Sequence, residues 1–194
     1  KFIAVSVKMI VFILHSAGFT TFSLDICYGS YALLMHLSTD IFEKLKTCFL
    51  LERAAQIYCY ALILCANGFL HIDQVDDFYQ ESFLSVLYGS ILQNGYTALS
   101  NLLHDIGLRG NPVRQFEQSL IDACSRNVAI DGHVIRSCST ENDLAEPGYK
   151  LKELKNSQVN VLIAYDIQNR LPLMYRTYQG SSVDKKSVKD LLLS

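Results

Sequence analysis

The sequence predicts an α/β protein in which an all-helical N-terminal region precedes three strands of an incomplete sheet. Up to residue 125 apolar residues recur at helical spacing, and near Arg126 the pattern changes to that of extended strands. A short apolar run, Val128-Ala129-Ile130, is followed about thirty residues later by an apolar hairpin from Val159 to Tyr178. We therefore expect a helical part over 1–125 and a sheet-forming part over 126–194.

The composition is that of a globular chain without a membrane span. Half of the 194 residues are apolar, and 11 Tyr and 10 Phe favour a packed core over disorder. The two candidate apolar runs, Met9–Leu14 and Ile57–Ala66, have six and ten residues. A bilayer span needs about 20, so both runs are expected to be buried helices rather than a signal peptide or an anchor.

The helices of the first part follow from periodicity and caps. Residues 1–30 carry no assignable pattern, whereas Tyr31–Phe69 is helical, with Asp40 as a plausible N-cap. Ala54–Ala66 is apolar nearly all round, which is typical of a helix enclosed by others. A helical segment is also expected over Asp73–Tyr88.

Two more helices are expected before the strands, making four or five in all. The first ends at Gly107 as a C′ glycine, and the second opens at Asn111-Pro112 with proline at its first position. The apolar stripe of the first helix has the spacing i, i+3, i+4, i+7 and consists of Leu99, Leu102, Leu103 and Ile106.

The cysteines predict buried thiols. None of the six belongs to a Cys-x-x-Cys pair, so a zinc site is not expected. Four lie in apolar helical context, where free cysteine behaves as a small hydrophobe, and this favours a reducing compartment.

The hairpin should be covered on both faces. Apolar residues occupy every second position from Val159 to Tyr165, and Leu162 and Ala164 between them are also apolar. Asp166–Arg170 is polar turn material, and Asp166 is expected to shape the turn. Leu171–Tyr178 forms the second arm. Ser181 should cap a final helix, with Asp184 as the acid of a capping box rather than a catalytic group.

Positive charge is concentrated in the sheet-forming part. The net charge is −2, yet residues 149–194 hold eight Lys or Arg against four Asp or Glu. A local basic excess suits phosphate contacts, and an ordinary solvated surface explains it equally well. The candidate phosphate contacts are Lys150, Lys152 and Lys155.

Five stretches in a fixed order carry a resemblance to a known family: Ala129–His133, Gly148–Leu154, Val159–Asp166, Leu171-Pro172 and Gly180–Asp184. They resemble the DDE transposases of a large bacterial insertion-sequence group, whose catalytic core is ribonuclease H-like. Two helical stretches, Tyr79–Leu84 and Ala98–Gly107, also look like the N-terminal part of these enzymes, which is thought to grip element-end DNA.

The resemblance implies the fold and the chemistry of a two-metal nuclease. Residues 126–194 would be the first half of a ribonuclease H-like domain, with Asp131 on a central strand as first catalytic acid and metal ligand. The ions would be Mg²⁺ or Mn²⁺, which prefer oxygen ligands. The alternative for Asp131 is a strand acid that bonds a neighbouring backbone amide. His133, two residues on, should share its face; it could contact DNA or the metal shell, or could be a partly buried structural histidine.

Two departures from the family pattern bear on activity. The family usually has Asn after the glycine that corresponds to Gly180, where this chain has Ser181. Its second catalytic Asp and its Glu would lie beyond Ser194, so a truncated or inactive fragment is expected. An edge strand left unpaired where the next core strand should dock would make the chain prone to aggregate.

Three functions remain open at this stage. The first is a transposase that binds insertion-sequence terminal repeats in the bacterial cytoplasm, at the nucleoid, with a homodimer possible in the complete enzyme. The second is a non-catalytic DNA-binding remnant of such an enzyme. The third, suggested by the apolar first seventy residues, is a helical membrane or interaction protein.

Overall fold

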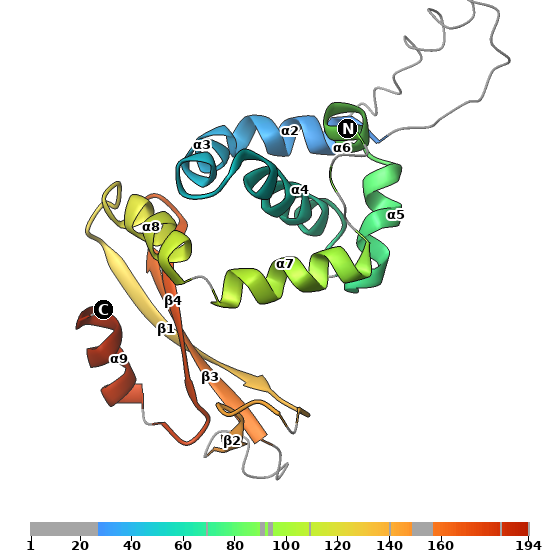
Figure 1. Ribbon diagram of the computed structural model, residues 1–194. Helices are drawn as coiled ribbons and strands as arrows, with labels where there is room; N and C mark the ends of the chain where they lie inside the picture. Colours follow the sequence, from blue (N-terminus) through green and yellow to red (C-terminus); the bar gives the residue numbers. More distant parts are fainter. Residues whose placement is uncertain are drawn as a thin grey trace, which may run out of the picture. The chain divides into compact units, whose positions relative to one another are not determined.

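The computed structural model consists of helices followed by an antiparallel sheet (Figure 1). It divides into two compact units between Phe116 and Glu117. The structure describes residues 27–68, 70–89, 92, 95–108, 110–139, 141–148, 157–182 and 184–193. The expectations for most of 1–30 and for the three candidate phosphate-binding lysines therefore fall outside the described residues.

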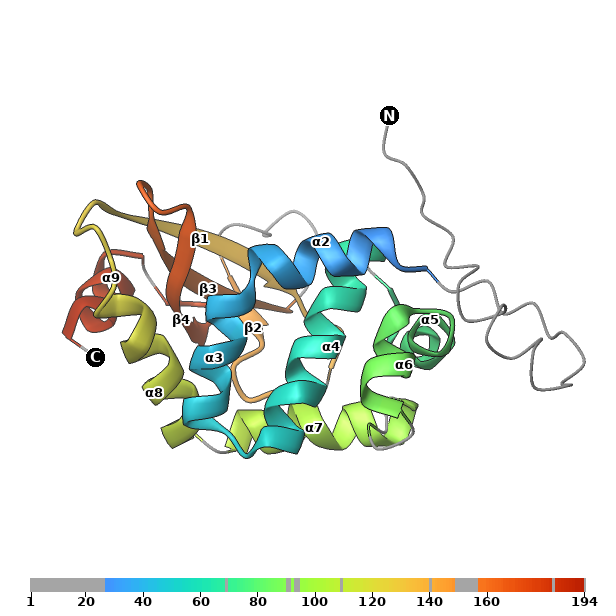
Figure 2. The same ribbon diagram turned by 90° about the horizontal axis from the view of Figure 1, so that it is seen from above.

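The first unit confirms the predicted helical region but divides it more finely. Seven α-helices precede Asp131 among the described residues, where four or five were expected. Figure 2 shows α4 within this unit, in contact with α2, α3 and α5. The helices are α2 (Gly29–Leu37), α3 (Thr39–Cys48), α4 (Leu51–Asn67), α5 (Val75–Gln80), α6 (Phe83–Tyr88), α7 (Tyr96–Leu108) and α8 (Gly110–Ile121), with a 3₁₀ turn, η1 (Ile72–Gln74), before α5.

The additional break between α2 and α3 lies at Ser38. Its hydroxyl donates to the carbonyl oxygen of Leu34 at 2.7 Å and lies 2.8 Å from the hydroxyl of Tyr58 on α4. The N-cap of α3 is therefore Ser38, without a side-chain capping bond, and Asp40 lies inside the first turn. Asp40 was wrongly predicted as the cap because the contact that fixes the break comes from a residue 20 positions away.

Helix α4 supplies much of the core of this unit, although it is not enclosed all round. Ala54, Cys59 and Ile63 are fully buried, while Ala61 and Cys65 on its other side are exposed. The prediction of a fully enclosed helix was wrong because α4 is packed along one side only. No single helix in the described part of the chain is long and apolar enough to cross a membrane; α4 and Ile72–Gln80 reach that length only together, across a 103° bend.

Two further expectations from the first unit and the cysteines need correction. Gly107 lies inside α7 rather than beyond its end. All six cysteines are free thiols, but only Cys59 is buried, whereas Cys27, Cys65 and Cys138 are exposed. Cys27 and Cys138 lie outside the helices, and the exposure of Cys65 depends on which side of α4 is packed, which local sequence does not specify.

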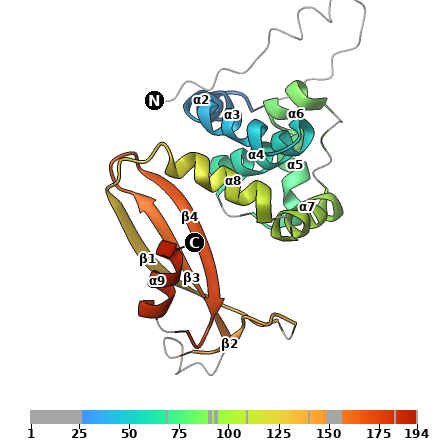
Figure 3. The same ribbon diagram turned by 60° about the vertical axis from the view of Figure 1, so that its left-hand side comes forward.

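The second unit is a four-stranded antiparallel sheet with a C-terminal helix (Figure 3). Strand β3 is central: it pairs with β1 on one edge, and with β4 and the short β2 on the other. The predicted hairpin is confirmed as β3 and β4. The elements are β1 (Val128–Arg136), β2 (Glu146–Pro147), β3 (Ser157–Asp166), β4 (Leu171–Gln179) and α9 (Asp184–Leu193).

Strand β1 is therefore an edge strand among the described residues, whereas the resemblance implied a central strand for Asp131; only a further strand on its outer edge would make it central. Two-sided burial of β3 is correct for Gln158–Leu162 but not for Ile163 and Tyr165, each of which is 38% exposed. Strand β2 was not predicted, because two residues carry no readable alternation.

Asp166 closes the β3–β4 turn as expected. It is fully buried, and its carboxylate accepts hydrogen bonds from the backbone N–H groups of Gln168 and Asn169, at 3.0 and 3.1 Å. Its Oδ2 also accepts from the backbone N–H of Ser125 at 2.7 Å, and the Ser125 hydroxyl donates to its Oδ1. The Ser125 hydroxyl is the largest cause that lowers the pKa of Asp166 to about 2.

A buried polar cluster fixes the other end of the sheet. The side-chain amide of Gln158 donates to the carbonyl oxygen of Gly180 at 2.9 Å, and that of Asn160 donates to the carbonyl of Ser182 at 3.1 Å. The hydroxyl of Ser181 donates to the carboxylate of Glu146. Since α9 begins at Asp184, Ser181 is not its N-cap, and the predicted capping box is wrong.

Candidate metal and nucleic-acid site

The sheet has one face covered by α9 and one that α9 does not cover. The hydroxyl of Tyr178 donates to the carbonyl of Ser187 and the carboxylate of Asp190 on α9, at 3.0 and 3.1 Å. Tyr178 lies opposite Asn160 of β3, so α9 covers the face of Asn160. Asp131 lies opposite Ile163, whose side chain points the other way. We call this second side the open face; it carries Asp131, Ile163 and Tyr175.

The open face is apolar and accessible around Asp131. Ile163 and Tyr165 are each 38% exposed, Tyr175 is 52% exposed and Ile135 is 53% exposed. The tyrosines were not among the predicted site residues, although the alternation of β3 contained the signal for Tyr165. Exposed aromatic rings offer flat surfaces on which unstacked bases can lie.

The carboxylate of Asp131 is exposed and has one local contact. Its Oδ1 accepts a hydrogen bond from the N–H of Gly132 at 2.8 Å. That contact is the structural alternative foreseen from the sequence. An exposed carboxylate held by one neighbouring amide also keeps its outer side accessible to a cation.

His133 shares the open face with Asp131, as the strand period predicts, and lies opposite Val161. It is exposed, so the expectation of a partly buried structural histidine is wrong. The reason is that α9 covers the opposite face of the sheet, so this side of β1 is left accessible.

The described residues do not make a two-ion site. They contain no group of three or more His, Cys, Asp or Glu side chains that could hold a metal ion. One carboxylate can contribute to a Mg²⁺ or Mn²⁺ ion that is otherwise held by water and phosphate. Two ions need more carboxylates, so no catalytic step follows from these residues alone.

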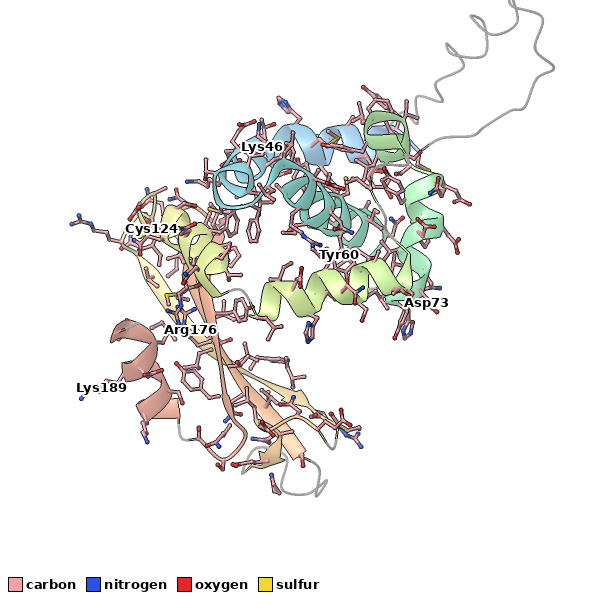
Figure 4. All side chains as sticks on the ribbon, viewed as in Figure 1. Lys46, Tyr60, Asp73, Cys124, Arg176 and Lys189 are labelled. Atoms are coloured by element: carbon pink, nitrogen blue, oxygen red, sulfur yellow. The ribbon has the colours of Figure 1, made fainter. Side chains whose placement is uncertain are left out.

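A partly buried ion pair lies at the outer edge of β4, where Figure 4 labels Arg176. Glu117, 6% exposed, accepts from the backbone N–H of Tyr175 at 3.2 Å and from Nη1 of Arg176 at 2.8 Å. Glu117 thus also provides an acceptor for the backbone N–H of Tyr175, which faces away from β3 at the outer edge of β4. The sequence held a signal for it, since Glu117 stands between the apolar residues Phe116 and Leu120 of α8.

Comparison of the chain with protein-family models, with curated proteins and with solved structures found no match. The resemblance to DDE transposases therefore stays a prediction.

Proposed function

We propose that this protein acts in DNA transposition as a relative of the DDE transposases, with Asp131 as one metal-binding carboxylate. The observation that carries the proposal is the exposed acid on the open face of β1. The antiparallel hairpin of β3 and β4 follows it in the chain, and α9 comes after the hairpin. Ribonuclease H-like enzymes begin their metal site with an acid on a strand that precedes an antiparallel hairpin. The partner would be duplex DNA of insertion-sequence ends, in the bacterial cytoplasm at the nucleoid.

The chain's own residues support binding more directly than catalysis. Asp131 offers one ligand to a Mg²⁺ or Mn²⁺ ion bound at a DNA phosphate, and the exposed rings of Tyr165 and Tyr175 lie on the same face of the sheet. Because a two-ion reaction needs further carboxylates, cleavage by the chain alone is expected to be negligible.

A non-catalytic DNA-binding protein is the second candidate. The specific observation in its favour is that the described side chains form no cluster able to hold a metal ion. Both candidates bind DNA, and they differ in whether the carboxylate of Asp131 takes part through a divalent ion.

The test is the affinity of the chain for a labelled duplex, measured by fluorescence anisotropy over a salt series in EDTA and in Mn²⁺. We expect affinity that falls steeply with salt, because phosphate contacts release counterions. In Mn²⁺ the affinity should rise by on the order of tenfold, because an ion held by Asp131 would also bind a DNA phosphate. A tenfold change corresponds to about 1.4 kcal/mol of binding free energy. Protein concentrations are kept low, so that pairing of β1 with a second copy of the chain does not compete with binding at Asp131.

Variants decide between the candidates. Asp131→Asn should abolish the response to Mn²⁺, and in EDTA it should bind at least as tightly as the parent, because the change removes a negative charge beside the phosphate. Asp143→Asn, which changes another exposed acid of this unit, should keep the response. Binding without any response to Mn²⁺ supports the second candidate, and no binding at low salt excludes both.

The three candidate phosphate-binding lysines can be tested in the same assay. Replacing all three by Gln should weaken binding of all duplexes alike and reduce the salt dependence of the affinity, as expected for phosphate contacts. Unchanged binding would assign these lysines to a solvated surface. They are Lys150, Lys152 and Lys155.

A further inference from the structure

The outer edge of β1, which faces away from β3, has no paired strand in the described part of the chain. The N–H of Ile167 donates to the carbonyl of Asn127 at 3.0 Å, in register with the β1–β3 ladder, and the N–H of Ser137 donates to Ser157 at 2.9 Å. Odd-numbered residues of this segment therefore bond across to β3. The outward backbone groups belong to Val128, Ile130, Gly132, Val134 and Arg136.

The length and sequence of this edge allow pairing with another strand. Strand β1 is nine residues long and contains no Pro or Lys, the residues that commonly protect an edge. Its central outward donor, the N–H of Gly132, bonds only the carboxylate of the preceding Asp131, at 2.8 Å. Such a contact is easily exchanged for a backbone carbonyl of another strand.

We propose that β1 pairs in antiparallel fashion with β1 of a second copy, about a twofold axis at Gly132. In this register the outward groups of one copy meet outward groups of the other. Asp131 lies opposite His133 of the second copy, so that a carboxylate accepts from an imidazole N–H. The apolar residues Ile130 and Val134 also lie opposite each other.

The side chains select this register over its neighbours. A twofold axis at Asp131 would place two carboxylates opposite each other, and an axis at His133 would place two imidazoles opposite each other. Only the axis at Gly132 gives two symmetry-related pairs of Asp131 with His133 on the open faces. The inference rests on the β1 edge and its sequence rather than on the proposed function, and pairing of Asp131 with His133 would compete with metal binding by the same carboxylate.

Sedimentation velocity of the full chain from about 5 to 200 µM tests the association. We expect a dimer that dissociates on dilution. His133→Glu should raise the dimer dissociation constant about tenfold or more, because two carboxylate pairs are created at once. Adding Asp131→Lys should restore association, since opposite charges again face each other. A chain that is monomeric at 200 µM, or charge variants that associate like the parent, would overturn the proposal.

Disulfide trapping tests the register, in a background where the exposed Cys27, Cys65 and Cys138 are replaced by Ser. Gly132→Cys should give a covalent dimer on mild oxidation, since the two Cα atoms at the axis would be about 5.5 Å apart. Ile135→Cys is the matched control, because its two copies would lie about 20 Å apart along the strands. Equal trapping of both variants, or no trapping of Gly132→Cys, would contradict the axis at Gly132.

Discussion

Replacing Gly180 by alanine should lower the free energy of unfolding of the sheet unit more than almost any other single added methyl group. A Cβ at Gly180 would lie 2.1 Å from the backbone oxygen of Gln158 and 2.4 Å from that of Glu146. Both oxygens belong to paired strands, so neither can retreat without opening the contact between β2 and β3. Overpacking costs typically about 1–3 kcal/mol, and backbone clashes place this variant at about 3 kcal/mol.

The assay is urea unfolding followed by hydrogen exchange of the β3 peptide, Ser157–Asp166, which reports the sheet unit alone. At a slope of about 1.5 kcal/mol per molar urea, the midpoint should fall by about 2 M. Gly107→Ala is the control, since nothing lies within 4 Å of a Cβ there. It should leave β3 unchanged and stabilise α7 by about 0.5–1 kcal/mol. A Gly180→Ala midpoint within about 0.3 M of the parent would refute the packing described here.

Three further outcomes are expected. The pKa of Asp166 is lowered from 3.8 to about 2, so its carboxylate stabilises the fold above pH 3.8, and this stability is lost as the pH falls through about 2. Asp166→Asn should therefore make the urea midpoint less dependent on pH between 6 and 2. The same pH dependence in the variant and the parent would contradict this. Burial raises the pKa of Cys59 to about 12, so a thiol reagent should label Cys138 in the folded protein and Cys59 only on unfolding. Glu117→Ala should cost about 2 kcal/mol in the same urea assay, because it removes the carboxylate that neutralises Arg176 and accepts from the N–H of Tyr175; Glu117→Gln should cost less.

Periodicity and turn chemistry predicted the class of the fold. The helical first part, the β3–β4 hairpin and the role of Asp166 depend on local spacing, which sequence displays directly. The breaks and caps were not predictable in the same way. The break at Ser38 involves Tyr58, and Ser181 bonds Glu146 35 residues away, so both depend on tertiary contacts.

The candidate site was predictable in position but not in surroundings. The strand period placed Asp131 and His133 on one face, and the register agrees. Their exposure could not be predicted, because it depends on what covers the sheet, and α9 covers the opposite face. The exposed ring of Tyr175 was missed for the same reason, since an aromatic residue on a strand is ordinarily expected to be buried.

The most direct measurement is anomalous diffraction from crystals of the chain grown with a short DNA duplex and Mn²⁺. We expect an anomalous peak within about 2.5 Å of a carboxylate oxygen of Asp131, shared with a DNA phosphate. Manganese peaks at other acids, with none at Asp131 in a DNA-bound crystal, would contradict the claim that this carboxylate serves a metal-dependent reaction on DNA.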